Sequence, residues 1–165
     1  PATFTCTKPL PGKDSSSLTP TNPFRIDSTI TYKSIYKMKV VIIMGSASDE
    51  AHAKKITDNL DNLDINWEQF VASAHKQPLE VLKILEDNAN EESLVYVTIA
   101  GRSNALSGFV GANSEFPTIA CPPFSDKTDM MVNINSTLQM PSKTPVLTVL
   151  DPENCATAIS RIFKV

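Results

Sequence analysis

Val40-Val41-Ile42-Ile43-Met44 is a short apolar run rich in β-branched residues, and Gly45-Ser46-Ala47-Ser48-Asp49 follows it directly. A continuous run of this kind predicts a strand that is covered on both faces. Beyond the polar stretch, apolar residues recur at the helical spacing i, i+4, i+7: Ile56, Leu60 and Leu63. The sequence therefore predicts a strand, a polar turn and a helix, which together form the repeating unit of a parallel α/β sheet.

The same alternation occurs four more times along the chain. Further strands are predicted over 65–72, 94–100, 117–121 and 146–150, each followed by a polar turn and a helical pattern. The second helix should face inward with Val81, Leu82, Ile84 and Leu85, and the last with Ala158, Ile159, Ile162 and Phe163. Five such units predict a three-layer α/β/α sandwich around a doubly wound, mainly parallel sheet of the flavodoxin or Rossmann type.

Composition divides the chain into two parts. Residues 1–37 carry five prolines and twelve Ser/Thr without periodicity, so we expect a disordered tail or linker there, or a transit peptide. Residues 38–165 form the predicted domain and carry the acidic balance of a chain whose net charge is -3. An acidic body without a basic stripe argues against nucleic-acid binding, and no apolar run approaches the roughly 18 residues that span a bilayer.

The cysteines indicate a reducing compartment, so we expect a cytoplasmic protein. Cys6, Cys121 and Cys155 are odd in number and show no C-x-x-C spacing. This pattern disfavours both a disulfide framework and a zinc site. Cys121 ends an apolar run, where a free thiol usually behaves as a small hydrophobic side chain.

In a parallel sheet the turns at 45–49, 73–77, 101–107 and 121–126 should share one crevice. The first turn offers the flexible backbone of Gly45, the hydroxyls of Ser46 and Ser48, and amides at a helix start, which suit a phosphate. Asp49 could instead accept hydrogen bonds from ribose hydroxyls. Since one glycine and an N-capping Ser48 or Asp49 occur in many such turns, a purely structural role is also open.

The second turn contains Ser73, Ala74, His75 and Lys76. His75 can exchange a proton near neutral pH, although a surface loop histidine fits its position equally well. Lys76 suits a phosphate or carboxylate, or is a solvated lysine. The other histidine, His52, lies in the first turn of a helix, where we expect a solvated side chain rather than a catalytic one.

The third turn places an arginine, hydroxyls and an amide between two glycines, Gly101 and Gly108. Arg102 could pair with a carboxylate or phosphate of a ligand, or with an acid of a neighbouring subunit. Ser103 or Asn104 could cap the following helix. The fourth turn, Cys121-Pro122-Pro123, is rigid and has few donors, so we interpret it as a wall.

These stretches together resemble the phosphoribosylaminoimidazole carboxylase family from Lys39 to Phe163. The matching motifs are G-S-x-S-D at 45–49, S-A-H-K at 73–76, A-G-R-S-N-A-L-S-G at 100–108, A-C-P-P at 120–123 and S-T-L-Q-M-P-S at 136–142. One branch of the family is a mutase acting on N5-carboxyaminoimidazole ribonucleotide, and the other adds CO2 directly to aminoimidazole ribonucleotide. With Lys76 and the 101–104 stretch, this chain is similar to the direct branch.

The resemblance implies a role for each turn. Ser46, Ser48 and Asp49 would hold the ribose phosphate, Ser73 and Ala74 would lie against the imidazole ring, and His75 would be the acid/base. Lys76, Arg102 and Ser103 would line the CO2 or phosphate side, and Gly45, Gly101 and Asn104 complete the predicted binding set. The resemblance also implies a homo-oligomer, a tetramer or octamer with sites near subunit contacts, that needs no metal, biotin or ATP.

The chain departs from the family pattern at three positions and at its end. Lys143 stands where a glycine usually follows M-P-S, and Asn133 and Asn135 replace an acidic and an aromatic residue. The sequence ends at Val165, whereas relatives usually continue into a further helix. A mutase of the same fold, and a flavodoxin-like module that binds a nucleotide without chemistry, therefore stay open as alternatives.

Overall fold

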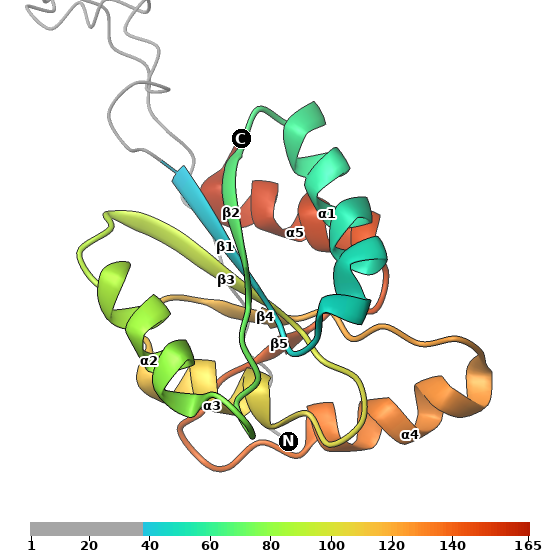
Figure 1. Ribbon diagram of the computed structural model, residues 1–165. Coiled ribbons are helices and arrows are strands. Elements are labelled where there is room, and N and C mark those ends of the chain that lie inside the picture. The colour runs from blue at the N-terminus through green and yellow to red at the C-terminus, as the bar shows by residue number, and fades with distance from the viewer. Residues whose placement is uncertain (1–37) are drawn as a thin grey trace, which may run out of the picture. The chain divides into compact units, whose positions relative to one another are not determined.

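The computed structural model describes residues 38–165, so the predicted tail lies outside the described residues. Strands and helices alternate along this part of the chain (Figure 1). In chain order they are β1 (Met38–Met44), the 3-10 turn η2 (Ala47–Asp49), α1 (Glu50–Asn62), β2 (Asn66–Val71), α2 (Pro78–Asp87), β3 (Ser93–Ile99), α3 (Ala105–Asn113), β4 (Thr118–Ala120), α4 (Lys127–Leu138), β5 (Leu147–Thr148) and α5 (Pro152–Phe163).

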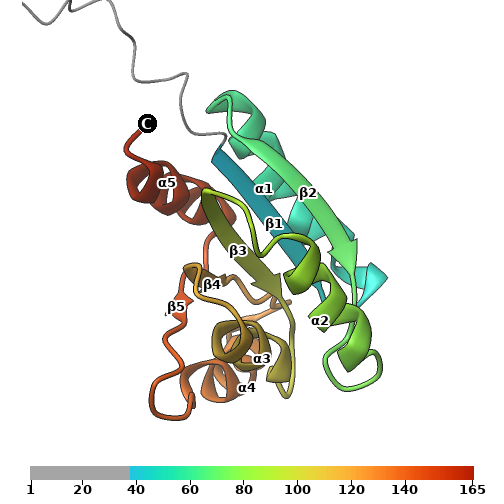
Figure 2. The same ribbon diagram turned by 90° about the vertical axis from the view of Figure 1, so that its left-hand side faces the viewer.

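The sheet is parallel throughout, with the strand order β2-β1-β3-β4-β5. Helices α1 and α5 cover one face, and α2 and α3 cover the other (Figures 1 and 2). The predicted doubly wound three-layer sandwich is therefore confirmed, and its strand order is that of the flavodoxin-like fold. Within residues 38–165, no helix is both long enough and apolar enough to cross a bilayer.

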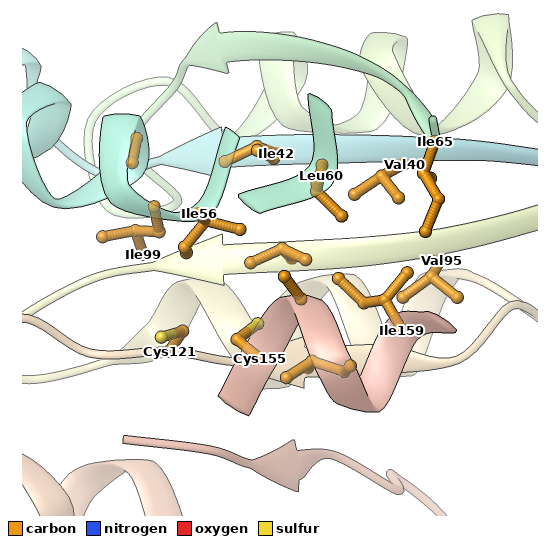
Figure 3. Packing of buried hydrophobic residues seen from close by; sticks show 14 of the residues in the cluster. Val40, Ile42, Ile56, Leu60, Ile65, Val95, Ile99, Cys121, Cys155 and Ile159 are labelled. Carbon is orange, nitrogen blue, oxygen red and sulfur yellow. The ribbon is translucent and has the colours of Figure 1, made fainter. Parts of the chain in front are cut away.

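The central strand β1 explains the two cores of the sandwich. Its side chains alternate, so that Val40 and Ile42 pack with α1 and α5 (Figure 3), whereas Val41 and Ile43 pack with α2 and α3. All four side chains are fully buried. Burial of each side chain stabilises the folded state by about 1.5–3 kcal/mol compared with an exposed position. The continuous apolar run at this strand thus reflects helices on both sides.

Two helix faces differ from the sequence-based expectation. Leu63 is 38% exposed because α1 ends at Asn62 and the chain turns away at Asp64, whose φ is 56°. Ile162 is 37% exposed because the buried stripe of α5 lies to one side of it. That stripe consists of Cys155, Ala156, Ile159 and Ser160, with Phe163 packed against the same core.

Candidate functional site

The carboxyl ends of β1, β2 and β3 lie at the same level of the sheet. Met44 at the end of β1 pairs in register with both Val71 and Ile99. Backbone hydrogen bonds continue one residue further, from Gly45 N to Ile99 O at 2.8 Å and from Ala72 N to Met44 O at 2.9 Å. The three turns that follow therefore leave the sheet side by side. They lie next to the topological switch point between β1 and β3, where the strand order reverses.

These three turns line one cavity of about 290 Å³. Its walls are Gly45, Ser46, Ser48, Asp49, Ser73, Ala74, His75, Ala100, Gly101, Arg102, Ser103, Ala105 and Leu106. Every residue of the predicted site is present except Lys76 and Asn104. The cavity thus brings a histidine, an arginine, a carboxylate and several hydroxyls together from three separate segments.

The fourth turn does not line this cavity, contrary to the expectation of a single crevice. Pro123, Phe124 and Ser125 instead line a neighbouring cavity of about 400 Å³, which adjoins the first at Gly101 and Arg102. Strand β4 also ends at a different level, since its last residue, Ala120, pairs with Thr98 rather than with Ile99.

In the first turn Ser46, rather than Ser48 or Asp49, is the capping side chain. Its Oγ accepts hydrogen bonds from Ser48 N at 3.3 Å and from Ser48 Oγ at 2.9 Å. Asp49 is the N-cap residue of α1 but makes no side-chain capping bond. Burial raises the pKa of Asp49, while the hydrogen bond from Ser46 and the charge of His52 oppose the rise. The turn therefore presents two hydroxyls and a partly desolvated carboxyl group.

The second turn is closed by two backbone hydrogen bonds to Ser73 O, from Lys76 N at 3.2 Å and from Gln77 N at 2.7 Å. Pro78 then begins α2 with its fixed φ. His75 lies within this closed turn and is exposed, although it lines the cavity. Lys76 is exposed and lies outside the cavity lining.

The third turn is held by a buried polar network centred on Asn104. Its Oδ1 accepts from Ser107 N at 3.1 Å and from Ser107 Oγ at 2.9 Å, so Asn104 is the predicted cap of α3. Its Nδ2 donates to Thr137 Oγ1 in α4 at 3.0 Å. Ser103, immediately before it, has a φ of 57°, which costs a residue with a Cβ about 1–2 kcal/mol. The network offsets this strain and fixes the loop that carries Arg102.

Arg102 pairs with an acid of its own chain. Its Nη2 donates to Asp129 Oδ1 at 3.3 Å, and the arginine side chain is 75% exposed. The backbone hydrogen bond from Ser125 and the guanidinium of Arg102 both lower the pKa of Asp129. Asp129 is not among the site residues predicted from sequence, although its place in the first turn of α4, three residues after the capping Asp126, is a signal for a fixed carboxylate.

His52 is not simply solvated, so that expectation was wrong. The imidazole is half-buried, and its Nε2 lies 3.5 Å from Cys121 Sγ. A sequence signal existed, because His52 precedes Ile56 by four residues and so extends the buried stripe of α1. In residues 38–165 no three His, Cys, Asp or Glu side chains are grouped so that they could hold a metal ion.

Comparison with known proteins gives one consistent result. A family model described as AIR carboxylase matches residues 39–165. The chain is 49% identical over 126 residues to the phosphoribosylaminoimidazole carboxylase of Archaeoglobus fulgidus, covering 76% of this chain and 69% of that protein. The enzyme of the same name from Treponema denticola is 45% identical over 125 residues, 75% of this chain and 78% of the relative. The crystal structure of Treponema denticola PurE superposes with a TM-score of 0.72 at 43% identity, covering 76% of this chain and 80% of that one.

Proposed function

The chain belongs to the AIR carboxylase family of purine biosynthesis, and we propose that it is a direct carboxylase, which converts 5-aminoimidazole ribonucleotide and CO2 to 4-carboxy-5-aminoimidazole ribonucleotide. The observation that carries this proposal is the single cavity where His75 meets Ser46, Asp49 and Arg102. The choice of branch rests on Lys76 and the 101–104 stretch, which resemble the direct carboxylases.

The substrate would lie across the three turns with its phosphate at the first. The hydroxyls of Ser46 and Ser48 and the amides at the start of α1 are suitable donors to a phosphate. The carboxyl group of Asp49 would repel a phosphate, and therefore suits the ribose hydroxyls. Arg102 keeps free donors for the phosphate or for the new carboxylate, because Asp129 contacts only Nη2.

The reaction requires a group that accepts a proton, whereas its nucleophile needs no activation. The aminoimidazole ring is an enamine, so its C4 attacks the carbon of CO2, and one C=O electron pair moves to oxygen. The C4–H bond then breaks, its electron pair restores the aromatic ring, and the proton passes to a neutral imidazole of His75 and on to water. A placed acid/base group contributes roughly 10²- to 10⁴-fold to such a step.

Two substrates distinguish the proposed reaction from the mutase. We expect turnover when the enzyme receives aminoimidazole ribonucleotide with CO2 supplied from bicarbonate. If the enzyme turns over only N5-carboxyaminoimidazole ribonucleotide, the mutase is the correct assignment. Product formation, followed by chromatography of the nucleotides, is the measurement for both.

The role of His75 is tested by His75→Asn, which keeps a polar side chain that can hydrogen-bond but cannot take up the proton. We expect kcat to fall roughly 10²- to 10⁴-fold while nucleotide affinity changes little. Unchanged turnover in this variant would remove His75 from the mechanism. If the wild type binds nucleotide but never converts it, the chain is a non-catalytic binding module instead.

We also infer that the enzyme is a homo-oligomer, a tetramer or octamer. The cavity of about 290 Å³ is at the small end of ligand pockets, which typically measure about 300–1,000 Å³, and His75 is exposed within it. Helix α4 also exposes large apolar side chains: Met131, Val132 and Leu138. A neighbouring subunit on this side would cover apolar surface, and one near the cavity would exclude water from the imidazole.

A further inference from the structure

Arg102 lies at the boundary between the candidate site and the adjoining cavity. It lines both the cavity of about 290 Å³ that contains His75 and the neighbouring one of about 400 Å³. The turn that carries Arg102 runs beside α4 (Figure 1). Its side chain is 75% exposed, and within residues 38–165 its one ion-pair partner is Asp129 in the first turn of α4. A long side chain that is so exposed needs a contact of this kind to keep a defined direction.

Asp129 is held by more contacts than the arginine that it binds. Its Oδ2 accepts hydrogen bonds from Ser125 N at 3.0 Å and from Ser125 Oγ at 3.3 Å, and its backbone N–H donates to Asp126 Oδ1 at 2.9 Å. Its side chain is only 20% exposed, and Oδ1 is left for Arg102 Nη2 at 3.3 Å. The backbone hydrogen bond from Ser125 and the guanidinium of Arg102 lower the pKa of Asp129, so the carboxylate is charged at neutral pH.

The segment before α4 is itself fastened to this helix. Asn133, one turn after Asp129 and 3% exposed, donates from Nδ2 to Pro123 O at 3.1 Å. Residues 123–125 are therefore tied to α4 at both ends, at Pro123 by Asn133 and at Ser125 by Asp129. The carboxylate of Asp129 thus projects from a fixed base, and of the two ionic partners the arginine has more freedom to move.

We propose that Asp129 is a positioning residue, which holds the guanidinium of Arg102 at the rim of the cavity so that it binds an anionic group of the nucleotide. This inference rests on the proposed function, in which Arg102 contacts the phosphate or the new carboxylate. The contact at Nη2 leaves the other donors of the guanidinium for the ligand. Without Asp129, the arginine loses its rotamer freedom only when the nucleotide binds, and the affinity for the nucleotide falls accordingly.

The direction of the change in affinity separates positioning from a simple effect of charge. A carboxylate near the site of an anion repels it, so Asp129→Asn would tighten binding if only the charge of Asp129 mattered. If Asp129 positions Arg102, the same substitution weakens binding by about two- to fivefold, the range that exposed ion pairs provide. Asparagine keeps an acceptor for Ser125, so the start of α4 should stay folded. Asp126→Asn is the matched control and should not weaken binding, because it removes the same charge from a residue that caps α4, where asparagine is an equally good cap.

The experiment is calorimetric titration of the full chain with aminoimidazole ribonucleotide and with its 4-carboxy product. Asp129→Asn should weaken the binding of both ligands if Arg102 binds the phosphate, which both carry. It should weaken the binding of the product alone if Arg102 binds the new carboxylate. In the Arg102→Gln background, Asp129→Asn should have no further effect, because the group that it positions is already absent.

Two results would overturn the proposal. One is that Asp129→Asn leaves the affinity for both ligands unchanged or increases it. The other is an equal loss of affinity in the wild-type and Arg102→Gln backgrounds, which would show that Asp129 acts on the fold and not through Arg102. The proposed function fails separately, if the wild type binds these ligands without converting them, and the titrations then still decide the role of Asp129. A wild type that binds neither ligand would overturn both.

Discussion

Asp49 is subject to two opposing requirements, one from the stability of the fold and one from ligand binding. Burial beside the cavity raises the pKa of its carboxyl group, so ionisation is harder in the folded than in the unfolded chain. The contribution of Asp49 to stability is therefore greatest below its unfolded pKa and is lost as the pH rises through its folded pKa. The proposed contact with ribose, in contrast, needs the carboxylate.

We therefore predict that Asp49→Asn stabilises the free protein near neutral pH and weakens nucleotide binding roughly tenfold to hundredfold, the range expected when a charge-assisted hydrogen bond is lost. The gain in the free energy of unfolding should shrink as the pH is lowered, because wild-type Asp49 then becomes protonated. Urea unfolding between pH 3 and pH 7 measures the first effect and nucleotide titration the second. Glu50→Gln, at the next and exposed position, controls for the loss of one negative charge; identical pH profiles of wild type and Asp49→Asn would contradict the prediction.

Lys143 carries backbone strain outside the site. Its φ is 65°, a left-handed conformation that costs a residue with a Cβ about 1–2 kcal/mol. We predict that Lys143→Gly raises the free energy of unfolding by about 0.5–1 kcal/mol, because the relief of strain exceeds the entropy that glycine adds to the unfolded chain. Lys143→Ala removes the amine but keeps the Cβ, so it should give no gain in urea unfolding. An equal gain from alanine would assign the effect to charge instead.

The position of a residue that follows a strand could be predicted from sequence, whereas contacts between residues far apart along the chain could not. Ser46 and His75 line the cavity because their places after β1 and β2 determine their position. Asn104 was included among the predicted ligands, yet its amide bonds to Thr137, 33 residues away. His52 contacts Cys121 across 69 residues. Local patterns carry no information about such pairs.

At the scale of elements, α3 approaches the segment before β5 so closely that a glycine is required. A Cβ on Gly111 would lie 2.9 Å from Val146 Cγ2 and 3.2 Å from Pro145 O. We predict that Gly111→Ala lowers the free energy of unfolding by about 1–3 kcal/mol, the usual cost of overpacking, measured by urea unfolding.

Gly108, one turn earlier in α3, provides the matched control. A Cβ there would lie 3.1 Å from Met140 Sδ, which belongs to a flexible side chain that can move. Since alanine also has a helix propensity about 1 kcal/mol better than glycine, Gly108→Ala should be neutral or slightly stabilising. Equal destabilisation by both substitutions would show that backbone contact at Gly111 is not the cause.

Strands β1 and β3 could be predicted because burial on both faces leaves a continuous apolar run. Lengths were less predictable at the edge of the sheet. The last strand was expected over 146–150 but spans only Leu147–Thr148, since β5 pairs with β4 alone. Leu147, in this edge strand, is 53% exposed, so this apolar residue is not part of the core.

At the scale of the whole molecule, the alternation of strands and helices predicted a parallel sheet but not the level at which each strand ends. The expectation of one crevice assumed four strands ending together. In the structure Met44 pairs with Ile99, whereas Ala120 pairs with Thr98, so β4 ends one residue earlier. Register between strands comes from packing across the sheet, so the pattern along one segment does not show the level at which its strand ends.

The proposed assembly leads to a prediction about α4. This helix packs mainly against α3 and exposes Met131, Val132 and Leu138 by 58%, 50% and 61%. Met131 and Leu138 are seven residues apart and so lie on one side of the helix, where they form an apolar surface with no cover from the described part of the chain. If a second subunit covers this surface, a buried charge there would be costly, whereas the same charge on a monomer would be solvated.

We therefore predict that wild-type protein is larger than a monomer in light scattering, and that Met131→Asp combined with Leu138→Asp gives smaller particles with lower kcat/KM. The free energy of unfolding of the isolated subunit should change by less than about 0.5 kcal/mol, because both side chains are exposed in it. The conservative pair Met131→Leu and Leu138→Met should keep both the assembly and the activity, since it preserves the apolar surface. If the aspartate variant forms particles of the same mass as the wild type, α4 is not the subunit contact. If the wild type is a fully active monomer, one subunit alone is sufficient for the reaction at His75.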